Sequence, residues 1–125
     1  MTALLLIAHG SRNAEANADL LHLAEELRAD YAVVVASYLE LAPPGIEEGA
    51  RQCVAQGVNR VVLVPYFLSA GVHVRRDLTE ARDRLAAEFP HVEFRLAEPL
   101  GRHPLLVEVV RERIGEASHI PSPSA

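Results

Sequence analysis

The amino-acid sequence predicts an α/β fold: a doubly wound, four-stranded parallel sheet with strand order 2-1-3-4, in a three-layer sandwich. Short apolar runs alternate along the chain with longer amphipathic stretches, which is typical of strands that alternate with helices. The apolar runs are continuous, as in strands that a parallel sheet buries on both faces. Right-handed crossover connections between such strands place helices on both sides of the sheet.

Four apolar runs are predicted to be strands. The first is the run ALLLIA, which ends at the turn His9-Gly10-Ser11, and the third contains the run VVLV. Runs of this length, bounded by turn-forming or charged residues, suit strands better than helices. The predicted strands are residues 3–8, 32–39, 60–66 and 92–96.

Four amphipathic segments are predicted to be helices. Asn13 is a suitable N-cap for the first, and Gly57 can adopt the left-handed conformation that ends the second. Pro90 stops the third helix, and Pro104 can occupy the first turn of the last, where its missing N–H costs nothing. The predicted helices are residues 13–28, the segment from Pro43 to about residue 56, residues 74–88 and residues 104–114.

Length and composition indicate one domain at residues 1–116, followed by a flexible, Pro- and Ser-containing C-terminal tail at residues 117–125. The net charge of −5 argues against a general nucleic-acid binder, which needs a basic face. A single cysteine, Cys53, provides neither a disulfide framework nor a thiolate zinc cluster. The N-terminal apolar run is too short to span a membrane and lacks the basic flank of a signal peptide, so we expect a cytoplasmic protein with no membrane partner.

Polar residues follow three of the predicted strands at one edge of the sheet. Ligands of open parallel sheets bind beyond the carboxyl ends of the strands, where the strand order reverses, and here that point lies between strands 1 and 3. His9 follows the first strand, Glu40 follows the second, and the loop after the third runs from Tyr66 to His73. We therefore expect two histidines and a carboxylate to converge on one edge.

His9, Glu40 and His73 could bind a metal ion, but each also has a purely structural explanation. Imidazole binds iron, cobalt, nickel or zinc, and a carboxylate can add a ligand or accept a proton. Alternatively, His9 satisfies backbone groups in its turn, Glu40 caps the following helix, and His73 is an exposed loop residue. The spacing alone decides little, because the chain contains no compact metal motif such as HExxH.

Three motifs resemble those of a known family, the class II tetrapyrrole chelatases of the small CbiX type. They are IAHGSR at residues 7–12, SYLELAP at residues 37–43, and the long segment VPYFLSAGVHVRRD at residues 64–77. The resemblance extends over about residues 3–116, and the third motif is the most specific. The family includes sirohydrochlorin ferrochelatases and sirohydrochlorin cobaltochelatases.

The resemblance implies a flavodoxin-like chelatase fold and a metal chelatase (a lyase). The implied reaction is ATP-independent insertion of a divalent metal, iron or cobalt, into sirohydrochlorin for siroheme or cobalamin biosynthesis. The resemblance also implies that His9 and His73 bind the metal and assist deprotonation of the macrocycle, with Glu40 as their acidic partner. Nickel is a further substrate in this family, and no cofactor beyond the metal substrate is implied. The single-copy length resembles the short form, which pairs as a homodimer with the tetrapyrrole between subunits.

Sirohydrochlorin carries many carboxylates, so basic groups near the cleft would help it to dock. Arginines at the start of a helix can equally well be solvated, which is the structural explanation for Arg75 and Arg76. The residues expected to contact the macrocycle come from the turn after the first strand and the loop after the third: Ser11, Arg12, Tyr66, Ser69, Ala70, Gly71, Arg75 and Arg76.

Other functions on a similar scaffold remain open. A carrier of metal or tetrapyrrole would use the same residues without turnover. A histidine phosphatase also has His-Gly after its first strand, but it requires Arg before the histidine, where this chain has Ala8. A receiver domain requires acidic residues where this chain has His9, and a flavodoxin requires a Ser/Thr-rich phosphate loop that Ser11 alone does not supply.

Overall fold

The computed structural model describes residues 1–118, which form four strands alternating with four helices. The elements are β1 (Thr2–Ala8), α1 (Ala14–Leu27), β2 (Val33–Tyr38), α2 (Ile46–Val54), β3 (Arg60–Pro65), α3 (Val72–Glu88), β4 (Glu93–Leu96) and α4 (Pro104–Ser118). The strands form one parallel sheet in the order β2-β1-β3-β4. The predicted strand order and fold class are therefore confirmed.

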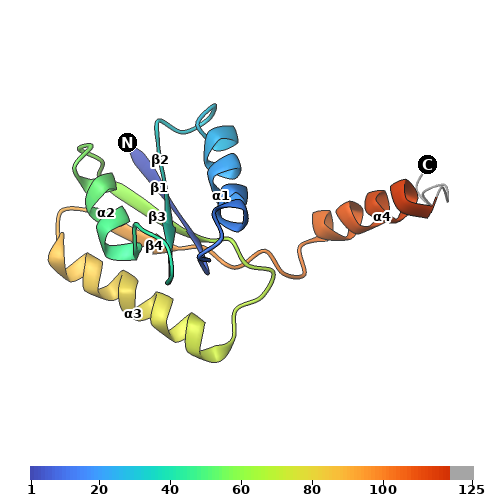
Figure 1. Cartoon of the computed structure of the whole chain (residues 1–125). Helices are drawn as coiled ribbons and strands as arrows, with labels where there is room; N and C mark the ends of the chain where they lie inside the picture. The colour runs from blue at the N-terminus through green and yellow to red at the C-terminus, as the bar shows by residue number, and fades with distance from the viewer. Residues whose placement is uncertain (119–125) are drawn as a thin grey trace.

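Helices cover both faces of the sheet (Figure 1). α1 packs on β1 and β2 from one side, whereas α2 and α3 pack on the other side, α2 over β1 and β2 and α3 over β4. Leu4 and Leu6 of β1 point toward α1 and meet Leu20 and Ala24 there. The intervening residues of β1, with Leu63, Leu78 and Phe94 from neighbouring elements, form the larger core beneath α2 and α3. Both faces of β1 are thus buried, as its continuous apolar sequence predicted.

Local signals in the sequence set several of the helix ends. The Asn13 side chain accepts a hydrogen bond of 2.9 Å from the Glu15 backbone N–H, which caps α1. Gly57 has a φ of +79° just beyond α2, the left-handed conformation that a glycine adopts at little cost. These two assignments from sequence are confirmed.

Three helices differ in extent from the prediction. α2 is shorter than the segment from Pro43 to about residue 56, because Gly45 is its N-cap and the helix runs from Ile46 to Val54. α3 begins at Val72 rather than at residue 74, because Gly71 is extended (φ −67°, ψ 170°) and serves as its N-cap. His73 therefore lies in the first turn of α3 and not in the preceding loop. α4 continues to Ser118, so the first two residues of the expected tail, Ala117 and Ser118, are helical. The rest of that expected tail, residues 119–125, lies outside the described residues.

α4 extends away from the sheet instead of folding back over it (Figure 1). None of its side chains is buried, and within residues 1–118 it makes no substantial packing contact with another element. In this part of the chain α1 is consequently the only helix on its face of the sheet. No helix of the described residues is long and apolar enough to cross a membrane.

Candidate functional site

His9 and Glu40 lie side by side at the carboxyl edge of β1 and β2. The two strands pair in register up to Ala8 and Tyr38. The pairing continues beyond the strands, because the Glu40 backbone N–H donates to the His9 carbonyl over 3.1 Å. The expected meeting of these two residues is therefore found, and backbone hydrogen bonds hold it.

Gly10 permits this close approach of the two segments. Its φ is +93°, which an L side chain rarely adopts, and a Cβ at this position would lie 1.8 Å from the Glu40 carbonyl oxygen. Any residue larger than glycine would push the segment after β1 away from the segment after β2. The His-Gly dipeptide thus has a steric basis here: glycine lets the histidine turn sit directly against Glu40.

The His9 ring stacks on a buried aromatic ring from the segment after β3. The centroids of the His9 and Phe67 rings are 4.4 Å apart, and their planes are inclined by 30°. The Phe67 side chain is 5% exposed, so it belongs to the core. Because one side of the imidazole is fixed against this rigid neighbour, His9 has a defined orientation at the edge of the sheet.

A cleft of about 600 Å³ opens beside His9 and Glu40, between α2 and α3. Its lining also includes charged side chains from both helices, and the Arg84 guanidinium pairs with Glu47 over 3.3 Å across it. The residues lining it are His9, Leu39, Glu40, Gly45, Ile46, Glu47, Glu48, Val74, Asp77, Ala81 and Arg84. The cleft thus places one imidazole and four carboxylates around a single opening.

The charged residues contributed by the helices were not predicted from sequence. Asp77 and Arg84 follow Val74 at helical spacings of three and ten residues, so they lie on one stripe of α3. Glu47 and Glu48 are in the first turn of α2, where acidic residues are common because they interact favourably with the helix dipole. Because the helix dipole already explains Glu47 and Glu48, nothing in the sequence assigned them to a site. The stripe of Asp77 and Arg84 on α3 was the one feature that could have indicated the cleft.

His73 does not join His9 and Glu40. It is exposed in the first turn of α3, it does not line the cleft, and its Nδ1 lies 2.8 Å from Nη2 of Arg76. Within residues 1–118 no three His, Cys, Asp or Glu side chains are placed so that they could hold a metal ion. The structure brings together two of the three predicted ligands, and the assignment of all three as metal ligands stays a prediction.

The turn after β1 uses Ser11 for local structure. The Ser11 hydroxyl accepts a hydrogen bond of 3.0 Å from the Asn13 backbone N–H, and its own backbone exchanges two hydrogen bonds with the Asn17 side chain. Arg12 is exposed beside it. Tyr66, after β3, keeps 37% of its surface exposed while its backbone N–H donates to the Ile7 carbonyl over 2.7 Å.

Three of the remaining residues expected to contact a macrocycle line a second hollow, and Arg76 instead contacts His73. This hollow, of about 290 Å³, includes Ser69, Ala70 and Arg75, together with the segment after β4. Arg75 pairs with Glu98 over 3.3 Å at its rim. Gly71 caps α3 between this hollow and His73. The predicted contact residues thus occupy the same edge of the sheet as His9, but not the same cleft.

Burial changes the acidity of one hydroxyl beneath this edge. Tyr38 is 4% exposed, and burial raises the pKa of its phenol above the ordinary value of 10.0. The phenol donates a hydrogen bond of 3.2 Å to the Asn17 carbonyl. Tyr38 is therefore a neutral, structural support between β2 and α1, directly below the His9–Glu40 pair.

The fold and the site together define a class: a doubly wound α/β protein with a histidine and a carboxylate at the carboxyl edge of adjacent strands. The sequence model of the CbiX family matches residues 3–117. This chain belongs to the CbiX family.

Relatives and solved structures agree with this assignment. The chain is 35% identical over 120 residues to the chloroplastic sirohydrochlorin ferrochelatase of Arabidopsis thaliana, covering 94% of this chain and 53% of that protein. It is 31% identical to the sirohydrochlorin cobaltochelatase of Sulfolobus acidocaldarius, covering 94% of this chain and 93% of that protein. The CbiX protein of Marinobacter aquaeolei superposes with a TM-score of 0.83 at 34% identity, covering 95% of this chain and 98% of that one.

The relatives fall into two lengths. This chain spans about half of the plant ferrochelatase and 48% of the SirB protein of Bacillus subtilis, whose structure with Fe³⁺ superposes with a TM-score of 0.84 at 31% identity and covers 96% of this chain. It spans nearly all of the Sulfolobus and Marinobacter proteins. One copy of the fold in this chain therefore corresponds to a complete short relative or to half of a long one.

Proposed function

We propose that this chain is a metal chelatase that inserts a divalent metal, iron or cobalt, into sirohydrochlorin without ATP. The observation that carries the proposal is the His9–Glu40 pair at the mouth of the cleft, in a chain of the CbiX family. Relatives named sirohydrochlorin ferrochelatase and sirohydrochlorin cobaltochelatase support the substrate. Solved relatives that contain Fe³⁺ and cobalt support the two metals.

In the proposed mechanism this chain's own side chains bind the incoming metal and remove protons. The His9 imidazole, held against Phe67, lines the cleft and would supply a ring nitrogen as a metal ligand. Each insertion releases two pyrrole N–H protons from the macrocycle, so a base must lie near the metal, and Glu40 or a histidine accepts them. Glu40 lies next to His9 and can accept these protons while His9 binds the metal ion.

His73 is proposed as the second metal-binding histidine, on a neighbouring element of the same edge. Its first-turn position on α3 is exposed, so its side chain can reach a macrocycle at the rim. It must first release Arg76. Arg12, Tyr66, Ser69, Arg75 and Arg76 are proposed to contact the macrocycle, the arginines through its carboxylates.

An absorbance time course tests the proposal. Purified protein is mixed anaerobically with sirohydrochlorin and, in separate reactions, with Fe(II), Co(II) or Ni(II). We expect multiple turnovers per chain above the spontaneous rate. A spectral change that ends at one equivalent per chain would instead identify a carrier of metal or tetrapyrrole.

Variants link the activity to the site. His9→Ala and Glu40→Gln are expected to lower the insertion rate at least about 100-fold, and His73→Ala at least about 10-fold, with the fold retained. His22→Ala, an exposed histidine on α1 away from the cleft, is the matched control and should keep full activity. Near-normal turnover in both His9→Ala and His73→Ala would overturn the assignment of the site.

We also propose that the protein pairs as a homodimer, which would give one macrocycle site two copies of the fold. The two lengths of relatives support this, because the long ones have room for a second copy in the same chain.

A further inference from the structure

We infer that α4 of each chain packs on the sheet of a second copy, so that the dimer forms by mutual exchange of this helix. The inference deepens the proposed homodimer by naming the surfaces that meet. It rests on three observations: an apolar stripe on α4, an uncovered part of the sheet, and a connector that directs α4 away from its own domain.

α4 carries an apolar stripe that no part of residues 1–118 covers. Side chains spaced by three and four residues lie on one side of a helix. On α4 these are Leu106, Val107, Val110, Ile114 and Ala117. Val107, Val110 and Ile114 are 50%, 56% and 52% exposed. The acidic residues Glu108, Glu112 and Glu116 follow one another at intervals of four on the opposite side. A helix with this pattern buries its apolar side against a partner.

The sheet offers a matching surface on its α1 face. α1 packs over β1 and β2, and no described helix packs over β3 and β4 on that side. Val62 and Val64 of β3 point to this face and are half-buried beside the α1 cluster. In a doubly wound fold the helix after β4 ordinarily covers this position.

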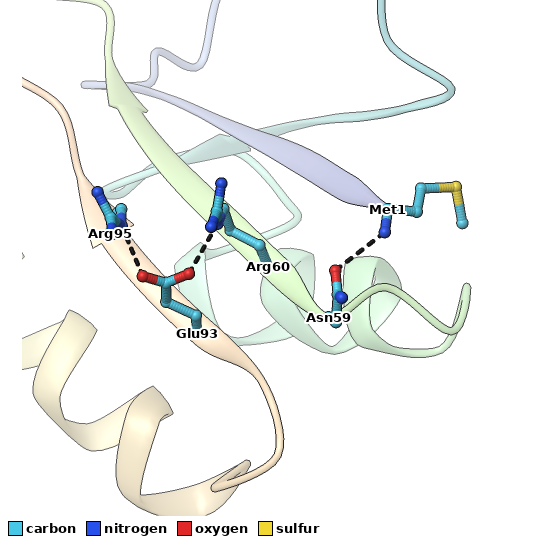
Figure 2. A network of polar contacts seen from close by, with 5 residues as sticks. All are labelled: Met1, Asn59, Arg60, Glu93 and Arg95. Carbon is cyan, nitrogen blue, oxygen red and sulfur yellow. Dashed lines mark hydrogen bonds and ion pairs between the residues drawn. The ribbon is translucent and has the colours of Figure 1, made fainter.

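Charged residues border the uncovered surface at its other end. Strand alternation places Arg60 on the same face as Val62, and Glu93 and Arg95 on the face opposite to the buried Phe94. Figure 2 shows the Glu93 carboxylate accepting hydrogen bonds from both arginines, each over 2.7 Å. The apolar part of the surface is therefore centred on β3, toward the carboxyl edge, where a helix entering from another chain would begin.

The connector between β4 and α4 is held at the carboxyl edge of the sheet, and α4 leaves it pointing outward (Figure 1). The Ala97 backbone N–H donates to the Leu63 carbonyl and the Leu100 N–H donates to the Phe67 carbonyl, each over 2.9 Å. Gly101 packs so closely that a Cβ would lie 2.0 Å from the Leu68 carbonyl oxygen. α4 starts three residues later and points outward (Figure 1). In this arrangement α4 leaves its own sheet uncovered and presents its stripe to a second copy.

Mutual exchange doubles the contact between the two copies. Stable interfaces bury about 1,200–2,000 Å² in total, and two exchanged helices would share this area between two identical contacts, each made by a five-residue stripe on a sheet. Exchange is reciprocal in a two-fold pair, because the same stripe and the same sheet surface meet twice.

Oligomeric state provides the first test, with neither metal nor tetrapyrrole present. Light scattering should give a mass of about 27 kDa, twice the chain mass of 13.6 kDa. Val110→Asp on the stripe and Val62→Asp on the sheet should each weaken dimerisation by about 100-fold or more, because each places a charge in the interface. Val109→Asp is the matched control: Val109 is 47% exposed and lies about 100° around the helix from Val110, so the dimer should persist.

Isotope-filtered NMR separates exchange from other dimers. In a sample that mixes ¹³C-methyl-labelled chains with unlabelled chains, nuclear Overhauser effects between Ile114 or Val110 and Val62 or Val64 should appear between chains. Contacts of this kind within one chain only, or none at all, would overturn the inference, as would a monomeric wild type. The insertion assay on the same variants keeps the two proposals apart: a dimer of this kind without turnover would refute the chelatase and leave the exchange standing.

Discussion

The Arg76 guanidinium donates a hydrogen bond to Nδ1 of His73 over 2.8 Å. Arginine has only donors, so Nδ1 must be the acceptor, and the proton of the neutral ring then lies on Nε2. In this arrangement neither nitrogen has a lone pair available for a metal. Binding of a metal by His73 therefore requires Arg76 to leave, for example toward a carboxylate of the macrocycle.

Arg76→Ala is expected to bind Co(II) more tightly than the wild type by about 3- to 10-fold in the absence of tetrapyrrole, because the competing hydrogen bond is gone. Isothermal titration calorimetry measures the affinity. A long-range ¹H–¹⁵N NMR spectrum should show the Nε2–H form of His73 in the wild type and lose that preference in the variant. Arg75→Ala, which removes a neighbouring arginine paired with Glu98, should leave both readouts unchanged. Equal Co(II) affinity in all three proteins would show that Arg76 does not compete with the metal.

Gly10→Ala is expected to destabilise the protein by at least about 3 kcal/mol, because the added Cβ meets a backbone carbonyl and the φ of +93° is strained for alanine. Urea unfolding measures the change in the free energy of unfolding. Gly45→Ala is the control, since Gly45 has a φ of −74° and open space around a Cβ. It should cost less than about 1 kcal/mol. A stable Gly10→Ala protein would mean that the segments after β1 and β2 can separate.

Cys53 is expected to be unreactive in the folded protein. The thiol is completely buried in the core, and burial raises its pKa to about 12 from 9.0. At pH 8.5 its reaction with an aromatic disulfide reagent should be on the order of 100-fold slower, or more, than in urea-unfolded protein, because the thiolate is the reacting form. Comparable rates in the two states would place Cys53 at the surface.

The same shift sets a pH dependence of stability. The pKa of the Cys53 thiol is higher in the folded than in the unfolded protein. The stability that the buried, neutral thiol contributes is therefore complete below pH 9.0 and is lost as the pH rises from 9.0 toward about 12. Unfolding of the wild type and Cys53→Ala, measured between pH 8 and 11, should show a wild-type advantage that shrinks with rising pH. A difference that does not depend on pH would contradict this.

Glu93 is expected to contribute to stability with the opposite pH dependence. Hydrogen bonds from Arg95 and Arg60 lower the pKa of its carboxyl below 4.5 (Figure 2). The contribution is therefore present above pH 4.5 and is lost as the pH falls through the lowered folded pKa. Thermal unfolding of wild type and Glu93→Gln should differ by a small amount at pH 7, since the network is exposed, and should converge in acid. A gap that widens toward low pH would refute this reading.

Much of the fold follows from local features of the sequence. Continuous apolar runs predicted strands that are buried on both faces, and Asn13 and Gly57 indicated where helices begin and end. The topological rule for parallel sheets then predicted that His9 and Glu40 would meet. This rule predicted the meeting of His9 and Glu40 because both residues directly follow their strands, and the strand order alone determines which strand ends are neighbours.

Other features depended on packing between distant elements. His73 lies in the exposed first turn of α3, which begins at Val72, and it does not line the His9 cleft. Asp77, Arg84 and Glu47 line the cleft because α2 packs beside α3, and each residue alone reads as an ordinary charged position on a helix surface.

The sequence by itself determined the strand order, the family and the edge of the sheet that carries His9 and Glu40, because these depend on short-range patterns and on connection rules. Only the tertiary structure decided where α4 lies. The apolar stripe of Val107, Val110 and Ile114 indicates that another surface covers it, but it does not indicate which surface. The place where α4 starts depends on the contacts of the connector with Leu63, Phe67 and Leu68. Those contacts join residues about 30 positions apart in the chain, and no local pattern encodes them.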